Sequence, residues 1–481
     1  MIVPFPLFEP DKSRFNSGAT DNTINCKPTA DGWGPFNTLN PLSGALPTTP
    51  LGSITVKADD GLVRIFVGTT TNLYEISTSD YTLSEISKST GAYAVPDGDQ
   101  WSFAVFGNNL VATALGTVPQ FIELNAGSAF ADLTGASFQA KYVATVGDFL
   151  VFGYMSTNNR IIRWSGINDM TFWTNGERGA DEQEFPDGGN IQGILTQTPN
   201  ALIAQANSWR RMLFDPSSDY TFLFEVINPT RGVYAPRSMV NIGLNDFVYL
   251  STDGFFRGVE SIPIGAERVD RWFKTLVNSS DMDLTRGVAD PYEKIVWWRF
   301  NDSGGTGHLL GYDWQLDRWC YSTQDTTDLL QAMTTGYTVD NVSAFGNVDT
   351  IVAGPDSQFW VGGVPGFAGW SSAFKFGFFD GATLAATLET EDKQLNYPRR
   401  AITDRASVLV DNDSFTVAIA SKETPKGTLT YGSDVSPESG TPWVSERVSG
   451  RYHRFKVKLA AGATWSNAVG VDTTFRDGGM W

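Results

Sequence analysis

Cysteine and histidine are nearly absent from this chain of 481 residues, and their scarcity excludes several kinds of site. There are two cysteines, Cys26 and Cys320, and two histidines, His308 and His453. Two cysteines cannot form a disulfide framework, and we expect two separate reduced thiols rather than a Cys26–Cys320 disulfide. Zinc sites need several His or Cys ligands at short spacing, so these four scattered residues predict no metal site. No Gly-x-Ser-x-Gly motif precedes either histidine, which argues against a catalytic triad.

Long hydrophobic runs and a basic N-terminal leader are also absent. No stretch reaches the roughly 18 apolar residues that a membrane helix needs, and the start of the chain lacks the charged segment of a signal peptide. We therefore expect neither a membrane-spanning segment nor secretion. The glycine-rich run at 304–307 is too short for a phosphate loop, and no twelve-residue calcium loop occurs, so we predict no cofactor.

Positive charge is scarce, because 53 acidic residues face 35 basic ones and the formal net charge is -18. Proteins that grip nucleic-acid phosphates present clustered Lys and Arg, so this balance argues against such a role. The excess of acidic over basic residues is confined to residues 1–388, which hold 41 acidic and 23 basic residues. Residues 389–481 hold 12 acidic and 12 basic residues. The chain therefore has two regions of different electrostatic character.

Short apolar strands joined by tight turns are the dominant pattern from about residue 50. The chain has 48 glycines, and helical blocks rich in Ala, Glu, Lys and Leu are absent. Apolar runs are repeatedly followed by a Gly, Asn or Asp turn and a second apolar run, which predicts β-hairpins. Hairpins are predicted at 62–76, 101–113, 142–153, 201–214, 247–258 and 294–312, with a further strand at 358–363.

The hairpins recur at roughly 40–50 residues, the period of four-stranded β-propeller blades. A single blade cannot cover both of its faces, whereas blades stacked around a ring bury them. We predict an all-β chain with an extended N-terminal arm (residues 1–46), a β-propeller of six or seven degenerate blades (47–384) and a C-terminal antiparallel β-sandwich (385–481). The arm is rich in Pro, Asn and Gly, and its aromatic residues must be buried against its own propeller or a neighbouring subunit.

Carboxylates are the residues that could still support catalysis, since a glycosidase needs only two. One acidic group, Asp281, Asp283 and Asp290, precedes Tyr292, and another lies in a predicted loop at residues 181–187. We favour solvated loops for both groups over a catalytic pair. We therefore predict no catalytic residue and no enzymatic activity.

Two segments, residues 162–173 and 310–319, share a finer pattern of strand, aromatic residue, Asp-containing turn and Trp. We favour a Trp that closes a blade core over an aromatic platform for a sugar. The Asp-box of sialidase-like propellers is missing, and residues 251–255 are only a fragment of it. A glycan-binding or glycan-cleaving propeller of a receptor-binding tail protein remains the alternative function.

The predicted strand at residues 452–459 has one basic and one apolar face, because side chains alternate along a strand. Such a strand suits the outer position of a small antiparallel sandwich. Arg pairs readily with carboxylates at interfaces, and residues 1–388 supply carboxylates, so we predict a subunit interface rather than a nucleic-acid stripe. The candidate interface residues are Arg399, Arg400, Arg451, Tyr452, Arg454 and Lys456.

The C-terminal region resembles a family of virion proteins. The residues that carry the resemblance are the stretch 388–395, the run Pro398-Arg399-Arg400, and the stretch 449–457. Together with the Pro/Asn-rich start and the degenerate propeller units, they are similar to the tail hub or nozzle proteins of short-tailed bacteriophages, also called packaged-DNA stabilisation proteins. The resemblance covers the whole chain in architecture, and only the terminal stretch is motif-like.

This resemblance implies a structural protein of the virion tail, assembled in the host cytoplasm. Members form a hexameric ring below the portal and adaptor proteins, continue the DNA channel, help retain the packaged genome, and dock tail fibres, spikes or a needle. Double-stranded DNA would pass transiently, without sequence recognition. An acidic channel wall would repel DNA phosphates and let the duplex slide, so we expect the excess negative charge to face the channel.

Overall fold

The computed structural model describes residues 1–14, 18–59, 62–218, 220–333, 365–412 and 414–479. Strands dominate these ranges. The helical elements among them are α1 (Asp270–Leu276), η1 (Pro236–Ser238) and η2 (Met282–Leu284). None of the helices in the described ranges is long and apolar enough to cross a membrane. The strand predicted at 358–363 lies outside the described residues.

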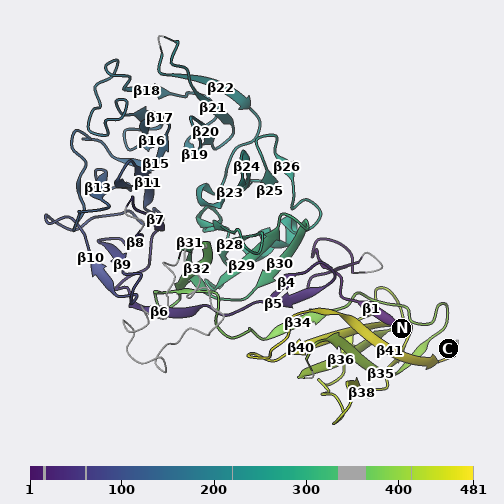
Figure 1. Cartoon of the computed structure of the whole chain (residues 1–481). Coiled ribbons are helices and arrows are strands. Elements are labelled where there is room, and N and C mark those ends of the chain that lie inside the picture. The colour runs from purple at the N-terminus through teal and green to yellow at the C-terminus, as the bar shows by residue number, and fades with distance from the viewer. Residues whose placement is uncertain (15–17, 60–61, 219, 334–364, 413, 480–481) are drawn as a thin grey trace.

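Within the described ranges, seven four-stranded antiparallel sheets are arranged around a ring, which makes a seven-bladed β-propeller (Figure 1). Blade 1 consists of β7 (Ser53–Lys57), β8 (Val63–Gly68), β9 (Leu73–Ile76) and β10 (Leu83–Glu85). Blade 2 consists of β11 (Ser102–Phe106), β12 (Asn109–Thr113), β13 (Gln120–Glu123) and β14 (Ala131–Asp132). Blade 3 consists of β15 (Ala140–Val146), β16 (Phe149–Met155), β17 (Asn158–Trp164) and β18 (Asp181–Glu184). Blade 4 consists of β19 (Ile191–Gln197), β20 (Asn200–Gln205), β21 (Trp209–Phe214) and β22 (Phe222–Asn228). Blade 5 consists of β23 (Val240–Gly243), β24 (Asp246–Leu250), β25 (Phe255–Arg257) and β26 (Ile262–Pro263). Blade 6 consists of β27 (Arg286–Asp290), β28 (Ile295–Asn301), β29 (Gly307–Asp313) and β30 (Arg318–Ser322).

All six predicted hairpins are confirmed as neighbouring strands of these blades. Local turn chemistry explains why they were visible in the sequence. Gly107 and Gly147 each begin a two-residue turn, with φ of 56° at both positions. A positive φ at the first turn residue matches the right-handed twist of the strands, and glycine adopts it without strain.

The arm completes the seventh blade. This blade consists of β31 (Thr326–Met333), β32 (Pro365–Ser371), β33 (Lys375–Phe378) and β6 (Asn40–Ala45). In the antiparallel pairing of β6 with β33, Pro41 lies opposite Gly377 and Asn40 opposite Phe378. The backbone N–H of Phe376 also donates to the Ser43 hydroxyl at 2.8 Å. The ring is therefore closed by hydrogen bonds between segments at opposite ends of the propeller sequence.

The C-terminal region forms two antiparallel sheets that share one apolar core, and the arm adds strands to the first of them. The first sheet contains β1 (Ile2–Pro4), β4 (Cys26–Pro28), β5 (Trp33–Pro35), β35 (Ala401–Val410), β38 (Trp443–Val444), β39 (Ser449–Gly450) and β41 (Ala468–Asp477). The second sheet, in spatial order, contains β34 (Ala386–Glu389), β40 (Tyr452–Leu459), β36 (Phe415–Lys422) and β37 (Thr430–Tyr431). Because β40 is paired on both edges, the expectation that it is an outer strand is wrong.

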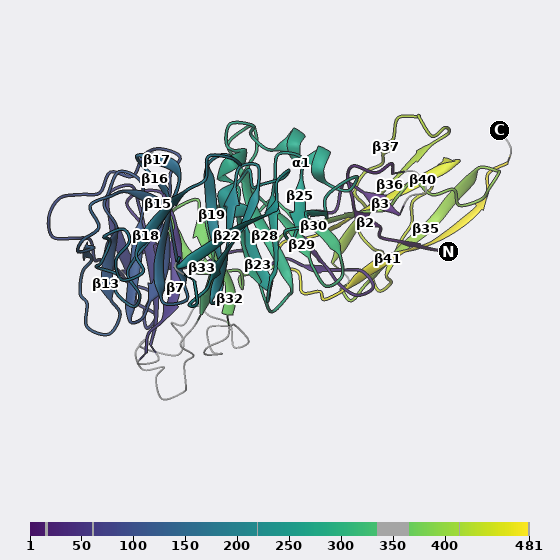
Figure 2. The same cartoon turned by 90° about the horizontal axis from the view of Figure 1, so that it is seen from above.

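Two linkers join the propeller to the sandwich, and they are hydrogen-bonded to each other. One runs from β5 to β6 and the other from β33 to β34. The N–H of Thr38 donates to the carbonyl of Ala382 at 2.8 Å, and the N–H of Leu384 donates to the carbonyl of Phe36 at 2.9 Å. The sandwich consequently lies beside one end of the propeller, with blades 1 to 3 at the far end (Figure 2).

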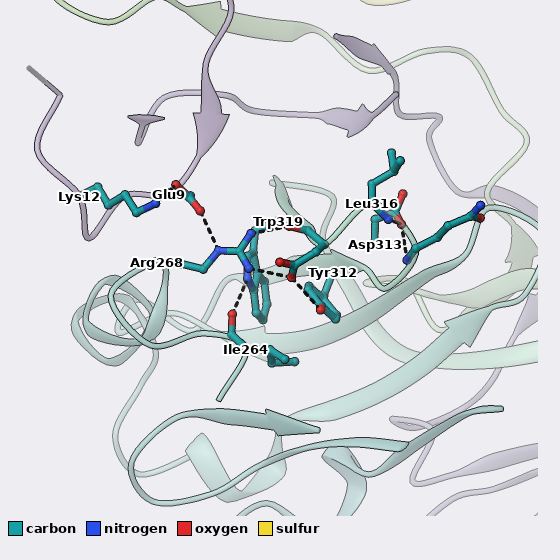
Figure 3. Close-up of polar contacts among 10 residues, drawn as sticks. Glu9, Lys12, Ile264, Arg268, Tyr312, Asp313, Leu316 and Trp319 are labelled. Atoms are coloured by element: carbon teal, nitrogen blue, oxygen red, sulfur yellow. Dashed lines mark hydrogen bonds and ion pairs between the residues drawn. The ribbon is translucent and has the colours of Figure 1, made fainter. Parts of the chain in front are cut away.

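The arm is also fixed to the propeller by side chains. Arg268, which precedes α1, donates from Nε to Glu9 Oε1 at 2.7 Å and from Nη1 to Asp317 Oδ1 at 2.7 Å (Figure 3). The hydroxyl of Tyr312 donates to the same Asp317 oxygen at 2.9 Å. A short parallel pair, β2 (Leu7–Phe8) with β3 (Ala19–Thr20), completes the arm. The arm therefore packs on its own chain, against both the propeller and the sandwich.

Candidate functional site

Three of the predicted interface residues are accessible on the sandwich, and each lies beside a carboxylate of its own chain. Arg399 is half exposed and pairs with Asp477 at 2.5 Å. Arg400 lies 2.6 Å and Arg451 lies 4.0 Å from oxygens of Glu423. A partner could reach these guanidinium groups only in competition with the intrachain pairs.

Arg454 and Tyr452 are buried, which differs from the surface role predicted for them. Arg454 is 3% exposed and Tyr452 is 7% exposed. The Nε of Arg454 donates to Asp392 Oδ1 at 2.9 Å, and its Nη1 lies 3.9 Å from Glu389. Both carboxylates are themselves buried. Arg454 therefore pairs inside the chain, and in this structure it is not available to a partner.

A set of charged residues surrounds Arg454, and we call it the Arg454 cluster: Arg14, Glu389, Asp392, Lys422 and Arg454. Lys422 Nζ lies 2.5 Å from Asp392, and Arg14 lies 3.9 Å from Glu389. Burial lowers the pKa of Arg14, with the positive charge of Arg454 as a further cause. The alternation of β40 correctly predicts its apolar face. On the other face, Arg454 is buried among Glu389, Asp392 and Arg14 of the arm, whereas Lys458 is exposed, and no local pattern shows this difference.

Lys456 points to a partner within the chain as well. Its Nζ lies 3.7 Å from the centroid of the Tyr431 ring, within the range of a cation–π interaction. The side chain is half-buried. Of the six predicted residues, Arg400 and Arg451 both lie within 4.0 Å of the Glu423 carboxylate.

The inner strands of the propeller carry a second buried charged cluster. Arg286 on β27 lies 2.6 Å from Asp328 on β31 and donates to the carbonyl of Ser53 on β7 at 3.3 Å. Arg237 on η1 donates to the carbonyl of Trp101 at 2.8 Å. Burial lowers the pKa of Arg237 to about 10 and raises the pKa of Asp328. These bonds connect blades across the ring and stabilise its closure.

Both histidines are buried within the fold. His308 on β29 lies 3.2 Å from Asp302 Oδ2 and 2.9 Å from the Tyr321 hydroxyl. His453 is fully buried, and burial lowers its pKa. Over the described residues, no group of three or more His, Cys, Asp or Glu could hold a metal ion. Cys26 and Cys320 are buried free thiols, as expected.

The two acidic groups differ in their surroundings. Asp290 is buried and accepts the backbone N–H groups of Tyr292 and Glu293 at 3.0 and 3.1 Å, so it caps a turn. Burial raises its pKa. The group at 181–187 lies on or next to β18, the outermost strand of blade 3, where Glu184 is exposed. The first group thus has a structural role at Asp290, and the second forms an acidic surface.

The Trp residues that end the two finer patterns are core residues. Trp173 is 6% exposed and donates to the carbonyl of Met170, and Trp319 is 1% exposed and donates to the carbonyl of Ile264. The interpretation that each Trp closes a blade core is therefore confirmed. A separate aromatic-lined cavity of about 270 Å³ lies between the arm and blades 6 and 7. Its lining includes Phe36, Asp290, Trp297, Phe367, Phe379 and Asp380.

A basic hollow that was not predicted from the sequence lies on the sandwich, and we call it the arginine hollow. It has a volume of about 760 Å³. It is lined by Asp404, Arg405, Trp443, Ser445, Arg447, Thr474 and Arg476. Its three arginines are far apart in the sequence, and no local pattern connects them. The register that places Arg405 opposite Thr474, and hence near Arg476, is visible only in the folded sheet.

Comparison with known proteins gives fold relatives only. No family model and no curated protein matches this chain. Among solved structures it is similar to BamB from Moraxella catarrhalis (11% identity, TM-score 0.35, covering 73% of this chain and 92% of that one). It is also similar to YCF48 bound to D1 peptide (13% identity, TM-score 0.32, covering 60% of this chain and 86% of that one). A third similar structure is a chain of a mitotic checkpoint complex (8% identity, TM-score 0.38, covering 74% of this chain and 96% of that one). The propeller assignment rests on the strand pairing described above.

Proposed function

We propose that this chain is a structural protein of a short phage tail, of the tail hub or nozzle kind. The phage assignment comes from the resemblance of the C-terminal residues. The observation that supports a structural role is the pair of hydrogen-bonded linkers between propeller and sandwich. A single linker allows two modules to rotate, whereas two paired linkers restrict bending at the junction.

The arm strengthens this connection. It contributes β6 to the last blade and β1, β4 and β5 to the sandwich, so the modules share strands from one segment. Pulling the modules apart would require many backbone hydrogen bonds to break together. A protein that holds a pressurised genome in place needs such resistance to deformation.

In this proposal, copies of the chain form a hexameric ring that continues the DNA channel and docks adaptor, fibre, spike or needle proteins. The excess negative charge of residues 1–388 faces the channel and repels DNA phosphates. Charge mapped on the assembled ring tests this orientation, and a basic channel wall would contradict it.

The direct test is to locate the chain in a particle. An epitope-tagged copy would be produced during particle assembly in the host that carries the coding sequence, and purified particles would be labelled with gold against the tag. We expect gold at the tail vertex and the chain among the particle proteins. Intact, infectious particles that lack the chain would refute the proposal.

A glycan-binding propeller is the second candidate, and the aromatic-lined cavity favours it. Burial raises the pKa of both Asp290 and Asp380, and one Asp380 oxygen is buried without a hydrogen-bond partner. Aromatic walls beside carboxyl groups are suited to sugar hydroxyls and ring faces. Reproducible binding of the purified chain on a glycan array, lost on Asp380→Ala, would support this candidate over the tail hub.

A further inference from the structure

The arginine hollow contains more positive than negative charge. Arg476 pairs with Asp404 through Nε at 2.6 Å, and this hydrogen bond lowers the pKa of Asp404. Arg447 is 76% exposed and lies 3.8 Å from the same carboxylate. Arg405 is exposed, and no hydrogen bond or ion pair of its guanidinium occurs within the described residues. Three guanidinium groups thus surround one carboxylate.

Such a surface is suited to carboxylates from another molecule. The guanidinium group is planar, and its fork of donors matches a carboxylate in two parallel hydrogen bonds. The half-buried ring of Trp443 lines the same hollow. Arg and Trp are both enriched, as is Tyr, among energetically important interface positions.

The acidic surface at β18 provides the matching charge. Residues 177–187 contain five acidic residues and one basic residue. Glu177 and Glu184 are exposed, and Glu182 is 39% exposed. Because β18 is the outermost strand of its sheet, one backbone edge has no strand partner among the described residues. The segment therefore presents carboxylates on an accessible edge.

The two surfaces lie at opposite ends of the molecule. Both views place β18 in the part of the propeller farthest from the sandwich, which carries β35, β38 and β41 (Figures 1 and 2). The distance between the ends prevents one copy from satisfying its own hollow with its own β18 edge. Two copies can do so when they associate head to tail.

We propose that the arginine hollow of one copy binds the acidic β18 edge of a second copy. The contact joins two different patches, so it is heterologous and generates a closed ring or an open filament rather than a two-fold dimer. This inference deepens the proposed ring-forming function and rests on it, by naming the two surfaces of the subunit contact.

Charge reversal on each side, followed by a full swap, tests the contact. The hollow variant is Arg405→Glu/Arg447→Glu, the edge variant is Glu177→Arg/Glu184→Arg, and the swapped variant carries all four changes. Sedimentation velocity would be measured at about 0.01 M salt, where the Debye length is about 30 Å, and at about 1 M, where it is about 3 Å.

We expect the wild-type chain to self-associate at low salt and to dissociate at high salt. Each reversal alone should weaken association at least tenfold, because like charges then face each other across the contact. The swapped variant should recover association, since its charges are again complementary. Lys57→Glu/Lys426→Glu and Glu123→Arg/Glu260→Arg match the two net-charge changes at exposed positions elsewhere, and both should behave as wild type.

A wild-type chain that stays monomeric in both buffers overturns the proposal, and so does a swapped variant that fails to recover. Duplex DNA that binds the purified chain, and no longer binds the hollow variant, would assign the hollow to nucleic acid instead. The outcome is separable from the proposed function. Gold-labelled tails that assemble normally from the hollow variant would refute this contact and leave the tail location intact.

Discussion

Replacing Arg454 with alanine should destabilise the sandwich although the residue was predicted to lie on its surface. Arg454 is 3% exposed, and its two closest ion-pair partners, Glu389 and Asp392, are also buried. Removing one partner of a buried pair costs about 3–5 kcal/mol, because a desolvated charge is left behind. We expect the lower end, about 3 kcal/mol, since Lys422 remains 2.5 Å from Asp392.

Hydrogen exchange on β36 and β40 is the suitable assay, because a two-module chain need not unfold in a single step. The amides of both strands should exchange faster in Arg454→Ala, while those of blades 1 to 3 stay unchanged. Lys456→Ala on the same strand is the matched control. Its cation–π contact with Tyr431 is partly exposed and is worth no more than about 1 kcal/mol.

The two interpretations of Arg454 give opposite results. If exchange in Arg454→Ala equals exchange in Lys456→Ala, the buried ion pairs do not stabilise the sandwich and the reasoning from burial is wrong. Unchanged exchange together with lost self-association would favour the original interpretation of Arg454 as an interface residue.

Three further experiments, two substitutions and one measurement of thiol reactivity, test other parts of the structure. Burial raises the pKa of Asp270 to about 6 from 3.8, so the folded state favours the protonated form and the contribution of Asp270 to stability falls as pH rises from about 4 to about 6. Asp270→Asn should remove this pH dependence and add about 2 kcal/mol to the free energy of unfolding at pH 7, measured by denaturation at a series of pH values. A Cβ on Gly377 would collide with the Asn40 carbonyl oxygen, so Gly377→Ala should displace β6, cost about 1–3 kcal/mol and make the arm sensitive to protease. An unchanged digest would contradict this. Cys26 and Cys320 are buried, and burial raises the pKa of both thiols; they should react with a thiol reagent only after unfolding, and rapid reaction of the native chain would show that the site opens.

The propeller could be predicted from the sequence because its hairpins depend on residues close together in the chain. Gly107 supplies the positive φ of one turn directly between its two strands. The sequence predicted six or seven blades and could not decide between the two numbers. The seventh blade needs β6, whose six residues include Pro41 and Gly44 and show no apolar alternation. Its conformation is set by the edge of β33.

The charged sites depend still more on distant contacts. Alternation correctly placed the apolar face of β40, but Arg454 is covered by residues that lie far away in the sequence. The arginine hollow was missed because Arg405, Arg447 and Arg476 lie in separate segments and converge only when β35 pairs with β41. A single Arg in the sequence does not indicate which distant residues will lie beside it in the folded chain.

The weak strand pattern of the arm follows from the order in which its partners are made. β6 pairs with β33, and β1 pairs with β41, so the arm must wait until nearly the whole chain exists. A strongly strand-forming arm would meanwhile expose a pairing edge to the wrong blade or to another chain. Proline and glycine lower that risk, and the late partners then impose the strand conformation. Pulse-labelled hydrogen exchange during refolding should therefore protect β8 and β9 before β6, because their contacts are local. Earlier protection of β6 would show that the arm nucleates the ring and would refute this account.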